Sequence, residues 1–347
     1  MERIHIAVIG PVNSGKSTLV NALCGQEVSL VSPVAGTTTD PVRKAVELPG
    51  LGACIIIDTP GLEDATVLGP ERMRRTLSVL DEADIAIVFP PFPKIDADIP
   101  VVNYTPGESI ESLLERIRKA LPKEEERFLT GDLVKTGDKV LLVMPQDSEA
   151  PKGRIILPQV QVLRELLDRG CIPVCCTPES LPEAIKMAPD LVITDSQVFA
   201  AVNSAIPAGT PLTSFSVLLA GAKGDIKTYV EGARAIENLK DGDRVLIAEA
   251  CTHVPDSEDI GRVKIPALLR KRARVEVEIA AGNDFPENLE GYSLIIHCGA
   301  CVAGRGLVQS RIKKALRKGV PITNYGIAIA ALQGILGRIE IPGRGRE

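Results

Sequence analysis

The sequence Gly-Pro-Val-Asn-Ser-Gly-Lys-Ser occupies positions 10–17 and directly follows an apolar run at residues 4–9. It matches the P-loop pattern in the required context, after a predicted strand and at the start of a predicted helix, residues 16–24. Backbone N–H groups of such a loop and the positive end of the helix hold phosphate groups. The residues predicted to bind the nucleotide phosphates are Gly10, Asn13, Ser14, Gly15, Lys16, Ser17 and Thr18.

Residues farther along the chain complete the predicted phosphate and metal site. Lys16 is expected to reach the β- and γ-phosphates, and the hydroxyl of Ser17 to bind Mg²⁺. The segment Asp-Thr-Pro-Gly at positions 58–61 ends a second predicted strand, residues 54–57. The Asp58 carboxylate can hold Mg²⁺ through water, and the Gly61 N–H can meet the γ-phosphate. In the Gly-Thr-Thr-Thr-Asp segment at 36–40, Thr38 is preferred over the threonine before it as the hydroxyl that completes the Mg²⁺ shell.

These motifs resemble the translation-factor-related class of GTPases, in particular the branch with a threonine-rich first switch. In that branch an asparagine at the position of Asn13 implies a bound K⁺, whose charge replaces an arginine finger; Asn13 can alternatively bond within its own turn. Guanine is read in this class by Asn-Lys-x-Asp. The nearest match is Pro-Lys-Ile-Asp at 93–96, so Lys94 and Asp96 are the candidate base-binding residues. The motif lies about 35 residues after Asp58, which indicates a domain shortened by about twenty residues. We expect poor base selection and slow, K⁺-stimulated hydrolysis of GTP.

Composition limits the function classes. The chain has 347 residues, a formal net charge of −5 and 45% hydrophobic residues. There is no basic block, no tryptophan and only 3% aromatic residues, so we expect no nucleic-acid partner. No apolar run reaches the length of a membrane span, and no signal peptide precedes the first strand, which predicts a cytoplasmic protein without a membrane anchor.

Cysteine and histidine gather in the last third of the chain. Cys251-Thr-His253 follows a predicted strand at residues 244–248, and His297-Cys298-Gly-Ala-Cys301 follows another at 293–296. Open α/β sheets bind ligands at such carboxyl ends of strands. Thiolates are soft ligands that zinc and iron–sulfur clusters both favour, and spacing leaves the two open. Zinc would close with four ligands, whereas a cluster on three cysteines leaves one iron to a replaceable ligand. His253 and His297 are the nearest candidates for that ligand, or can support it by hydrogen bonding.

Apolar runs alternate with helical patterns along the whole chain, which predicts an α/β fold. We expect three consecutive α/β domains: a shortened P-loop GTPase domain with a parallel sheet (1–125), a second domain (126–210), and an open sheet carrying the metal-cluster site (211–347). Three further cysteines flank a predicted strand at 172–174, where we expect buried packing roles. They are Cys171, Cys175 and Cys176.

A P-loop GTPase followed by Cys-x-His and His-Cys-x-x-Cys resembles the FeFe-hydrogenase maturation GTPases, the HydF family. The resemblance implies the order GTPase, dimerisation and cluster domain, with a 4Fe–4S cluster bound by Cys251, Cys298 and Cys301. It further implies a homodimeric scaffold that receives a transient di-iron subcluster from radical-SAM maturases and delivers it to apo FeFe-hydrogenase. GTP with Mg²⁺ would modulate partner exchange. The alternative interpretation is a regulatory GTPase with a structural zinc site.

Overall fold

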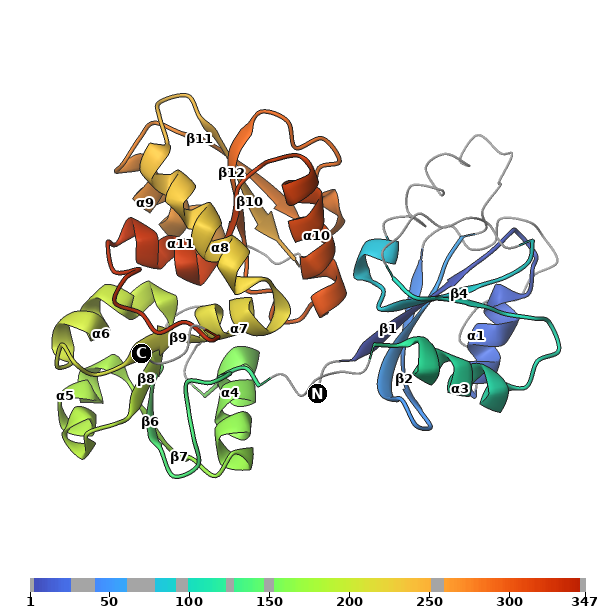
Figure 1. Cartoon of the computed structure of the whole chain (residues 1–347), viewed down its shortest axis with the longest axis horizontal. Coiled ribbons are helices and arrows are strands. Elements are labelled where there is room, and N and C mark those ends of the chain that lie inside the picture. The colour runs from blue at the N-terminus through green and yellow to red at the C-terminus, as the bar shows by residue number, and fades with distance from the viewer. Residues whose placement is uncertain are drawn as a thin grey trace. The chain divides into compact units, whose positions relative to one another are not determined.

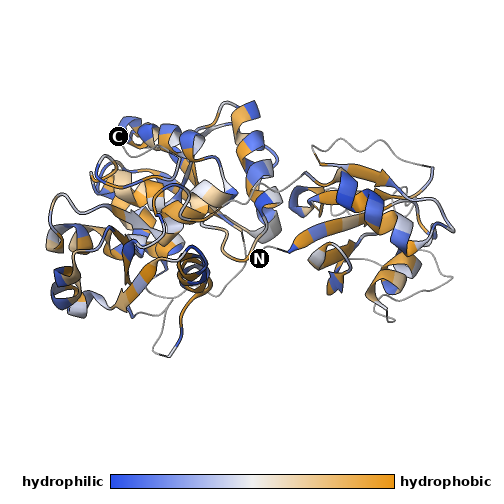
Figure 2. Ribbon diagram, turned by 60° about the horizontal axis from the view of Figure 1, so that its bottom comes forward, coloured by the Kyte–Doolittle hydropathy of each residue, from blue (hydrophilic) through white to orange (hydrophobic). Residues whose placement is uncertain are grey.

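The computed structural model describes residues 3–25, 41–60, 79–91, 99–122, 128–146, 153–250 and 259–343 (Figure 1). The chain divides into two compact units, Met1–Glu125 with Gly304–Ser310, and Glu126–Ala303 with Arg311–Glu347. Each unit contains parallel β-sheets with helices packed against them, so the α/β prediction is confirmed. Strands are mostly hydrophobic along their length, whereas several helices carry a hydrophilic face (Figure 2). In the described ranges, no helix is long and apolar enough to cross a lipid bilayer.

The elements are numbered along the chain. The strands are β1 (Ile4–Ile9), β2 (Val42–Leu48), β3 (Gly52–Asp58), β4 (Ile85–Val88), β5 (Val101–Asn103), β6 (Lys139–Val143), β7 (Ile172–Cys176), β8 (Leu191–Thr194), β9 (Leu212–Ser214), β10 (Arg244–Glu249), β11 (Glu276–Ala281), β12 (Tyr292–His297) and β13 (Ile322–Asn324). The α-helices are α1 (Lys16–Cys24), α3 (Ile110–Ala120), α4 (Leu157–Asp168), α5 (Leu181–Ala184), α6 (Phe199–Ala205), α7 (Phe215–Lys223), α8 (Ile226–Ala233), α9 (Ile265–Arg270), α10 (Arg305–Arg317) and α11 (Tyr325–Leu332).

The N-terminal sheet has the order β2-β3-β1-β4-β5, with β2 antiparallel at one edge and the other pairs parallel. Its central strand β1 is fully apolar over residues 6–9 because both faces are covered. One face packs against α1 and α3, through residues such as Leu23 and Ile117. The connection between the parallel strands β4 and β5 consists of residues 89–100, which is about the minimum length for a parallel crossover. The short connection is consistent with a shortened domain.

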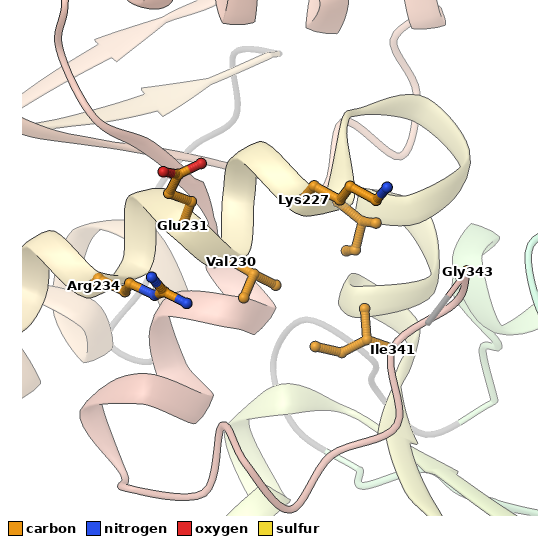
Figure 3. Close-up of a pocket in the computed structure, with 7 residues that line it drawn as sticks. Lys227, Val230, Glu231, Arg234, Ile341 and Gly343 are labelled. Atoms are coloured by element: carbon orange, nitrogen blue, oxygen red, sulfur yellow. The ribbon is translucent and has the colours of Figure 1, made fainter. Parts of the chain in front are cut away.

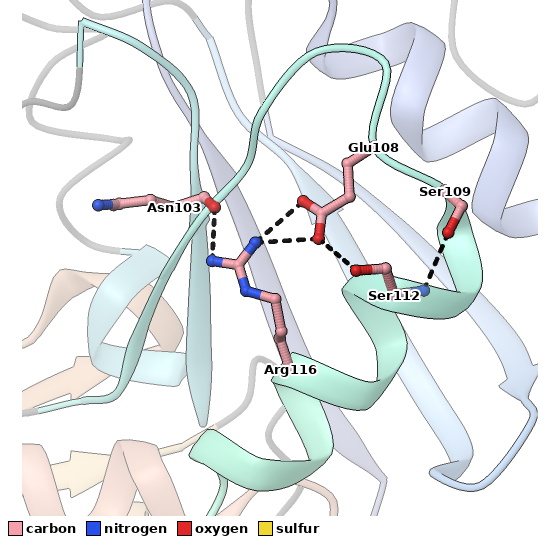
Figure 4. A network of polar contacts seen from close by, with 5 residues as sticks. All are labelled: Asn103, Glu108, Ser109, Ser112 and Arg116. Carbon is pink, nitrogen blue, oxygen red and sulfur yellow. Dashed lines mark hydrogen bonds and ion pairs between the residues drawn. The ribbon is translucent and has the colours of Figure 1, made fainter.

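A polar network orders the turn between β5 and α3 (Figure 4). The Arg116 guanidinium contacts both carboxylate oxygens of Glu108 at 2.9 and 3.0 Å and donates to the Asn103 carbonyl at 2.8 Å. Ser109 caps the helix by accepting from the Ser112 N–H at 3.2 Å, and the Ser112 hydroxyl donates to Glu108 at 2.9 Å. These groups are partly exposed, so the network fixes the turn and adds little to stability.

Two four-stranded parallel sheets follow within the second unit. The middle sheet has the order β7-β6-β8-β9 and the C-terminal sheet the order β11-β10-β12-β13. In both sheets the strand that comes second along the chain lies at an edge. Their sequences correspond: Gly-Asp-Lys-Val-Leu-Leu at 137–142 matches Gly-Asp-Arg-Val-Leu-Ile at 242–247, and Pro-Leu-Thr at 211–213 matches Pro-Ile-Thr at 321–323. The registers correspond as well: Val143, Thr194 and Ser214 lie in one row. In the C-terminal sheet the same row is Ala248, His297 and Asn324.

The helices after the last strands of these two sheets pack against each other. α7 begins after Ser214 and α11 after Asn324, each of which caps its helix with its side chain. The Ser216 hydroxyl donates to Asn324 Oδ1 at 3.0 Å and accepts from the Gly326 N–H at 3.1 Å. A side chain at Gly326 would place its Cβ 3.0 Å from the Ser216 Cβ, so glycine permits the close approach. The two sheets therefore belong to one compact unit.

Several elements differ from the sequence-based expectation. β9 and α7 lie beyond residue 210, where we expected the second domain to end, and β9 is the last strand of the middle sheet. The helical pattern of the sequence predicts one helix over 226–239, whereas α8 ends at Ala233 and the chain continues as a 3-10 helix, Arg234–Asn238. A second helical pattern, over 260–272, predicts a helix that in the structure begins with a π-helical turn, Ile260–Lys264. A third pattern predicts a helix over 71–80, which lies outside the described residues except for its end.

The three cysteines around β7 do not share one environment. Cys171 is buried, as expected, and its thiol donates to the Lys135 carbonyl at 3.4 Å. Cys175 is exposed, so the expectation of a buried role is wrong for it, and Cys176 is half-buried. The reason is that, among the residues that the structure describes, β7 is an edge strand and pairs only with β6.

Candidate functional site

The P-loop lies between β1 and α1 and has the backbone that its glycines allow. Gly15 has φ +93°, a left-handed conformation that favours glycine. A side chain at Gly10 would place its Cβ 2.5 Å from the Cβ of Phe89, so the loop packs closely on the end of β4. Asn13 has φ +59°, a conformation that asparagine tolerates better than most residues. Its side chain is exposed, as is Thr18, whereas Ser14 is half-buried.

Lys16 is buried at the base of this loop. Its ammonium donates to the carbonyl oxygens of Gly10 at 3.1 Å and Pro11 at 2.6 Å. Burial lowers the pKa of Lys16 to about 8, and the nearby Asp58 carboxylate opposes that shift. Burial disfavours the charged form of Lys16, so an anion close to the ammonium would stabilise that form. A phosphate group is an anion that can do this.

Ser17 and Asp58 come together as the motif predicts. The Ser17 hydroxyl donates to Asp58 Oδ2 at 2.7 Å, although the two residues lie 41 positions apart. The next residue, Thr59, donates to the Val8 carbonyl at 2.7 Å and fixes the end of β3 against β1. A hydroxyl and a carboxylate side by side are ligands that Mg²⁺ prefers. Four other predicted residues of this site lie outside the described residues, namely Thr38, Gly61, Lys94 and Asp96.

Cys298 lies one residue beyond β12, beside the end of β10. Its sulfur accepts hydrogen bonds from the Ala250 N–H at 3.1 Å and the Ala300 N–H at 3.4 Å. Its own N–H donates to the Ala248 carbonyl at 2.9 Å. Cys301, like Cys298, is half-buried. Ala250 immediately precedes the third predicted cysteine, Cys251, in the sequence. N–H donors at sulfur stabilise the thiolate, and this donor set therefore fits an iron–sulfur cluster or zinc.

His297 is fully buried behind these cysteines, and both of its ring nitrogens have partners. Nδ1 lies 2.8 Å from the Cys298 carbonyl oxygen, and Nε2 lies 3.2 Å from Nη1 of Arg311. Burial, reinforced by the Arg311 charge, lowers the pKa of His297 to about 3 and keeps the ring neutral. A neutral ring that accepts from Arg311 at Nε2 carries its proton on Nδ1 and donates it to Cys298.

The remaining residues of the predicted metal site, Cys251 and His253, lie outside the described residues. Within the ranges that the structure describes, no three Cys, His, Asp or Glu side chains converge as metal ligands. A pocket of about 340 Å³ lies elsewhere, along α8 (Figure 3). Its walls include Lys227, Val230, Glu231 and Ile341, with no cysteine or histidine, so it is separate from both predicted sites.

Three buried charged residues near the cysteines were not found from the sequence. Lys223 donates to carbonyls of the Cys298–Cys301 turn, Arg311 holds His297, and Glu249 forms an ion pair with Arg262 at 2.8 Å. Lys223 lies at the end of α7, Glu249 at the end of β10 and Arg311 on α10. A charged residue at an apolar position of the periodic pattern was the one available signal.

The fold and the P-loop define the first part of the chain as a P-loop GTPase domain, and comparison with known proteins agrees. A model described as a 50S ribosome-binding GTPase matches residues 5–130. The hydrogen maturase F dimerization domain matches 129–224, and the hydrogen maturase F tetramerization domain matches 227–341. The chain belongs to the hydrogen maturase F (HydF) family.

Other relatives match the GTPase part. The tRNA modification GTPase MnmE of Xanthomonas oryzae pv. oryzae (strain MAFF 311018) is 44% identical over 86 residues, 24% of this chain and 19% of that protein. MnmE of Chromobacterium violaceum is 34% identical over 125 residues, 35% of this chain and 25% of that protein. The chain thus spans between 19% and 25% of the length of these relatives. Among solved structures, Era of Aquifex aeolicus is 19% identical, covering 83% of this chain and 97% of Era, with a TM-score of 0.25.

Proposed function

We propose that this chain is a scaffold or carrier for the di-iron subcluster in FeFe-hydrogenase maturation, with a GTP-binding domain that modulates partner exchange. The observation that carries the proposal is the Cys298 sulfur, which accepts hydrogen bonds from the backbone N–H groups of Ala250, after β10, and of Ala300. The HydF domains over residues 129–341 support the same role.

The proposed resident cofactor is a 4Fe–4S cluster held by Cys251, Cys298 and Cys301. When bound, such a cluster on three cysteines supplies one iron with a replaceable ligand, at which a second metal fragment can attach. His297 is unsuited to that fourth position because both of its nitrogens are engaged. We propose that His297 instead supports the Cys298 backbone, which leaves His253 or an exchangeable ligand for the iron.

Anaerobic reconstitution with ferrous iron and sulfide tests the cluster. The protein should bind about four irons per chain and become brown, because thiolate-bound iron absorbs visible light. The competing interpretation, a regulatory GTPase with a structural zinc site, predicts a colourless protein with one zinc per chain. Transfer of a di-iron subcluster to apo FeFe-hydrogenase, measured as gained hydrogenase activity, then separates a carrier from a protein that merely binds iron.

The nucleotide half of the proposal rests on the phosphate site. Lys16, Ser17 and Asp58 are in place, so we propose binding of GTP with Mg²⁺, and slow hydrolysis that K⁺ stimulates through Asn13. The base-binding candidates Lys94 and Asp96 belong to a compressed motif without its asparagine. A lost base contact costs about 1–3 kcal/mol, which is about one to two orders of magnitude in affinity, so discrimination between GTP and ATP should be poor. Calorimetric titration with GTP, ATP and GDP in KCl and in NaCl measures both points.

We further propose that the chain acts in the cytoplasm as a homodimer that docks radical-SAM maturases and apo-hydrogenase. The edge strand β7 exposes Ile172, and the neighbouring helix α4 exposes Leu157, Val160 and Leu167 along one face. An unpaired strand edge beside exposed apolar side chains is suited to pairing with a second copy. Ile172→Lys should therefore lower the oligomer mass in multi-angle light scattering, and an unchanged mass would contradict this interface.

A further inference from the structure

The sheet of the first unit has no strand between β4 and β5. The two strands are hydrogen-bonded neighbours, with Val88 opposite Asn103. The guanine motif of such GTPases follows a strand of its own, whereas here the compressed motif at 93–96 falls within the connection between β4 and β5. The place beside β4 that a base-reading strand would occupy is therefore taken by β5.

The phosphate site fixes the direction in which a bound nucleotide extends. The predicted Mg²⁺ ligands Ser17 and Asp58 meet at the end of β3, on one side of β1, and mark the γ-phosphate end of the site. β4 and β5 lie on the other side of β1. Open α/β sheets bind ligands across the carboxyl ends of their strands. A nucleotide with its phosphates in the P-loop therefore directs its base past the end of β4 toward the end of β5.

Two aromatic residues lie along this path. Phe89 and Tyr104 directly follow β4 and β5, and their ring centroids are 4.8 Å apart. Phe89 is 1% exposed and packs beside the P-loop, because a Cβ at Gly15 would lie 3.8 Å from Phe89 Cε1. Tyr104 is only half-buried. Nucleobases stack on aromatic side chains of this kind, whatever the identity of the base.

The backbone holds Tyr104 in a fixed position. Its N–H donates to the Val88 carbonyl at 2.7 Å, and the preceding carbonyl, that of Asn103, accepts from Arg116 at 2.8 Å (Figure 4). Both sides of the Asn103–Tyr104 peptide are thus hydrogen-bonded, and Glu108 in turn holds Arg116. A side chain on a backbone that is already ordered loses little freedom when a ligand binds, which lowers the cost of binding.

We propose that Tyr104 is a base-binding residue of the nucleotide site: the base stacks on Tyr104, backed by Phe89, in place of hydrogen bonds to a complete guanine motif. This inference rests on the proposed binding of GTP. Every base has a π-face, so stacking adds affinity without selecting guanine, and ATP should bind as GTP does. The competing explanation is that Tyr104 only packs against the apolar core beside α1 and α3, which it also contacts.

Calorimetric titration of the full-length chain separates the two explanations. The ligands are the Mg²⁺ complexes of GTP, of ATP and of ribose 5-triphosphate, which carries the phosphates without a base. Tyr104→Leu keeps an apolar side chain and removes the ring, whereas Tyr104→Phe keeps the ring. Phe128→Leu is the matched control, because Phe128 is an exposed aromatic residue of the second unit. Circular dichroism checks that each variant is folded.

We expect the wild type to bind GTP and ATP with similar affinity, and ribose 5-triphosphate about tenfold more weakly. Tyr104→Leu should lower the affinity for both nucleotides by about tenfold, to the level of ribose 5-triphosphate, whose own affinity should not change. Tyr104→Phe and Phe128→Leu should match the wild type. Equal losses for all three ligands, a loss confined to GTP, or no loss in Tyr104→Leu would each overturn the proposal.

A second measurement uses the wild type alone, in case Tyr104→Leu does not fold. Irradiation with 8-azido-ATP attaches the base to the residues around it, and mass spectrometry locates the label. The label should lie at Tyr104 or its neighbours in the turn between β5 and α3, and a label found only elsewhere would overturn the proposal. If the wild type binds neither the nucleotides nor ribose 5-triphosphate, the proposed GTP binding itself fails, which is distinct from a failure confined to Tyr104.

Discussion

The middle sheet and the C-terminal sheet have the same strand order, all-parallel pairing and corresponding registers, but their cysteines lie at different strands. In the middle sheet Cys175 and Cys176 end the edge strand β7, whereas in the C-terminal sheet Cys298 and Cys301 follow the inner strand β12. At the carboxyl end of the middle sheet, the Thr194 hydroxyl donates to the Val143 carbonyl at 3.0 Å, and the following Asp195 accepts from Gln159 at 2.9 Å. In the C-terminal sheet, His297 and Cys298 occupy the corresponding positions. There the partners are Arg311 and backbone N–H groups.

The two sheets of the second unit differ at the ends of their strands and not in their interiors. The interior of both sheets is made of the same kind of apolar strand and serves only to bring the strand ends together. At the end of β8 in the middle sheet, the Thr194 hydroxyl bonds to a backbone carbonyl and the following Asp195 bonds to α4, while the thiol of Cys175 on the edge strand β7 is exposed. In the C-terminal sheet the strand ends leave two thiols half-buried. Substitutions at the strand ends should therefore change iron binding in the C-terminal sheet but not in the middle sheet. Substitutions at structurally equivalent positions, such as the helix caps, should lower stability by similar amounts in both.

The largest effect is expected at the thiols. Cys298→Ala or Cys301→Ala should reduce iron loading from about four per chain to nearly none, because two cysteines are too few to hold a cluster. Cys175→Ala is the control, since this thiol is exposed on the middle sheet. Iron content and visible absorbance after anaerobic reconstitution measure the outcome. Full loading of both variants would mean that the metal binds elsewhere.

A comparably large effect should be confined to the N-terminal unit. Lys16→Ala removes the buried ammonium of the P-loop, which should weaken GTP binding by about a hundredfold or more. Iron loading should stay unchanged, because the cysteines belong to the second unit. Calorimetry for GTP and an iron assay on the same preparation test the two statements. Loss of iron together with nucleotide would contradict the assignment of the metal site to the C-terminal sheet alone.

A smaller effect concerns the support of His297. Arg311→Met leaves His297 Nε2 and the Glu249 carbonyl without their donor, so the free energy of unfolding should fall by about 2–4 kcal/mol. Arg317→Met, on the exposed side of the same helix, should cost below about 0.5 kcal/mol. Urea unfolding followed by circular dichroism measures both. Equal stabilities of the two variants would show that His297 does not depend on Arg311.

The smallest effect compares the two helix caps. Ser214→Ala and Asn324→Ala each remove a side chain that accepts from the first turn of its helix, which should cost about 1 kcal/mol. Asn324 also donates to the Cys298 carbonyl at 3.4 Å, so only Asn324→Ala should alter the EPR spectrum of the reduced cluster. Ser204→Ala, on the exposed side of α6, is the control. An altered spectrum in Ser214→Ala would show that the hydrogen bond from Asn324 to Cys298 is not what makes the cluster sensitive to a helix cap.

The sequence predicts the fold best where a signal is local and strong. Residues 16–24 were expected as a helix and form α1 with those bounds, because the P-loop marks its start and Gly25 its end. The missed elements include β2, β9 and α7: β2 alternates charged and apolar residues, β9 has only three residues, and α7 is apolar almost all round, which hides its period. Burial of α7 against α11 decides its structure, and that contact is tertiary.

The site shows the same division. The P-loop residues and the Cys298–Cys301 pair are recognisable because each motif lies within a few consecutive residues. Lys223 and Arg311 are not recognisable, since their partners lie 77 and 14 residues away and involve backbone carbonyls or a single histidine. Only the fold brings these groups together, and no spacing rule describes them.

The 77 residues between Lys223 and the Ala300 carbonyl also set an order of events during synthesis. The ribosome completes α7 well before the turn that its lysine supports. Cys251 follows α7 in the chain, the other two thiols follow β12, and β13 comes later still. A nascent or prematurely ended chain therefore has an incomplete ligand set and a hydrated ammonium in place of a braced turn. The proposed cluster would thus require the finished polypeptide, and chains that end before Cys298 should bind no iron.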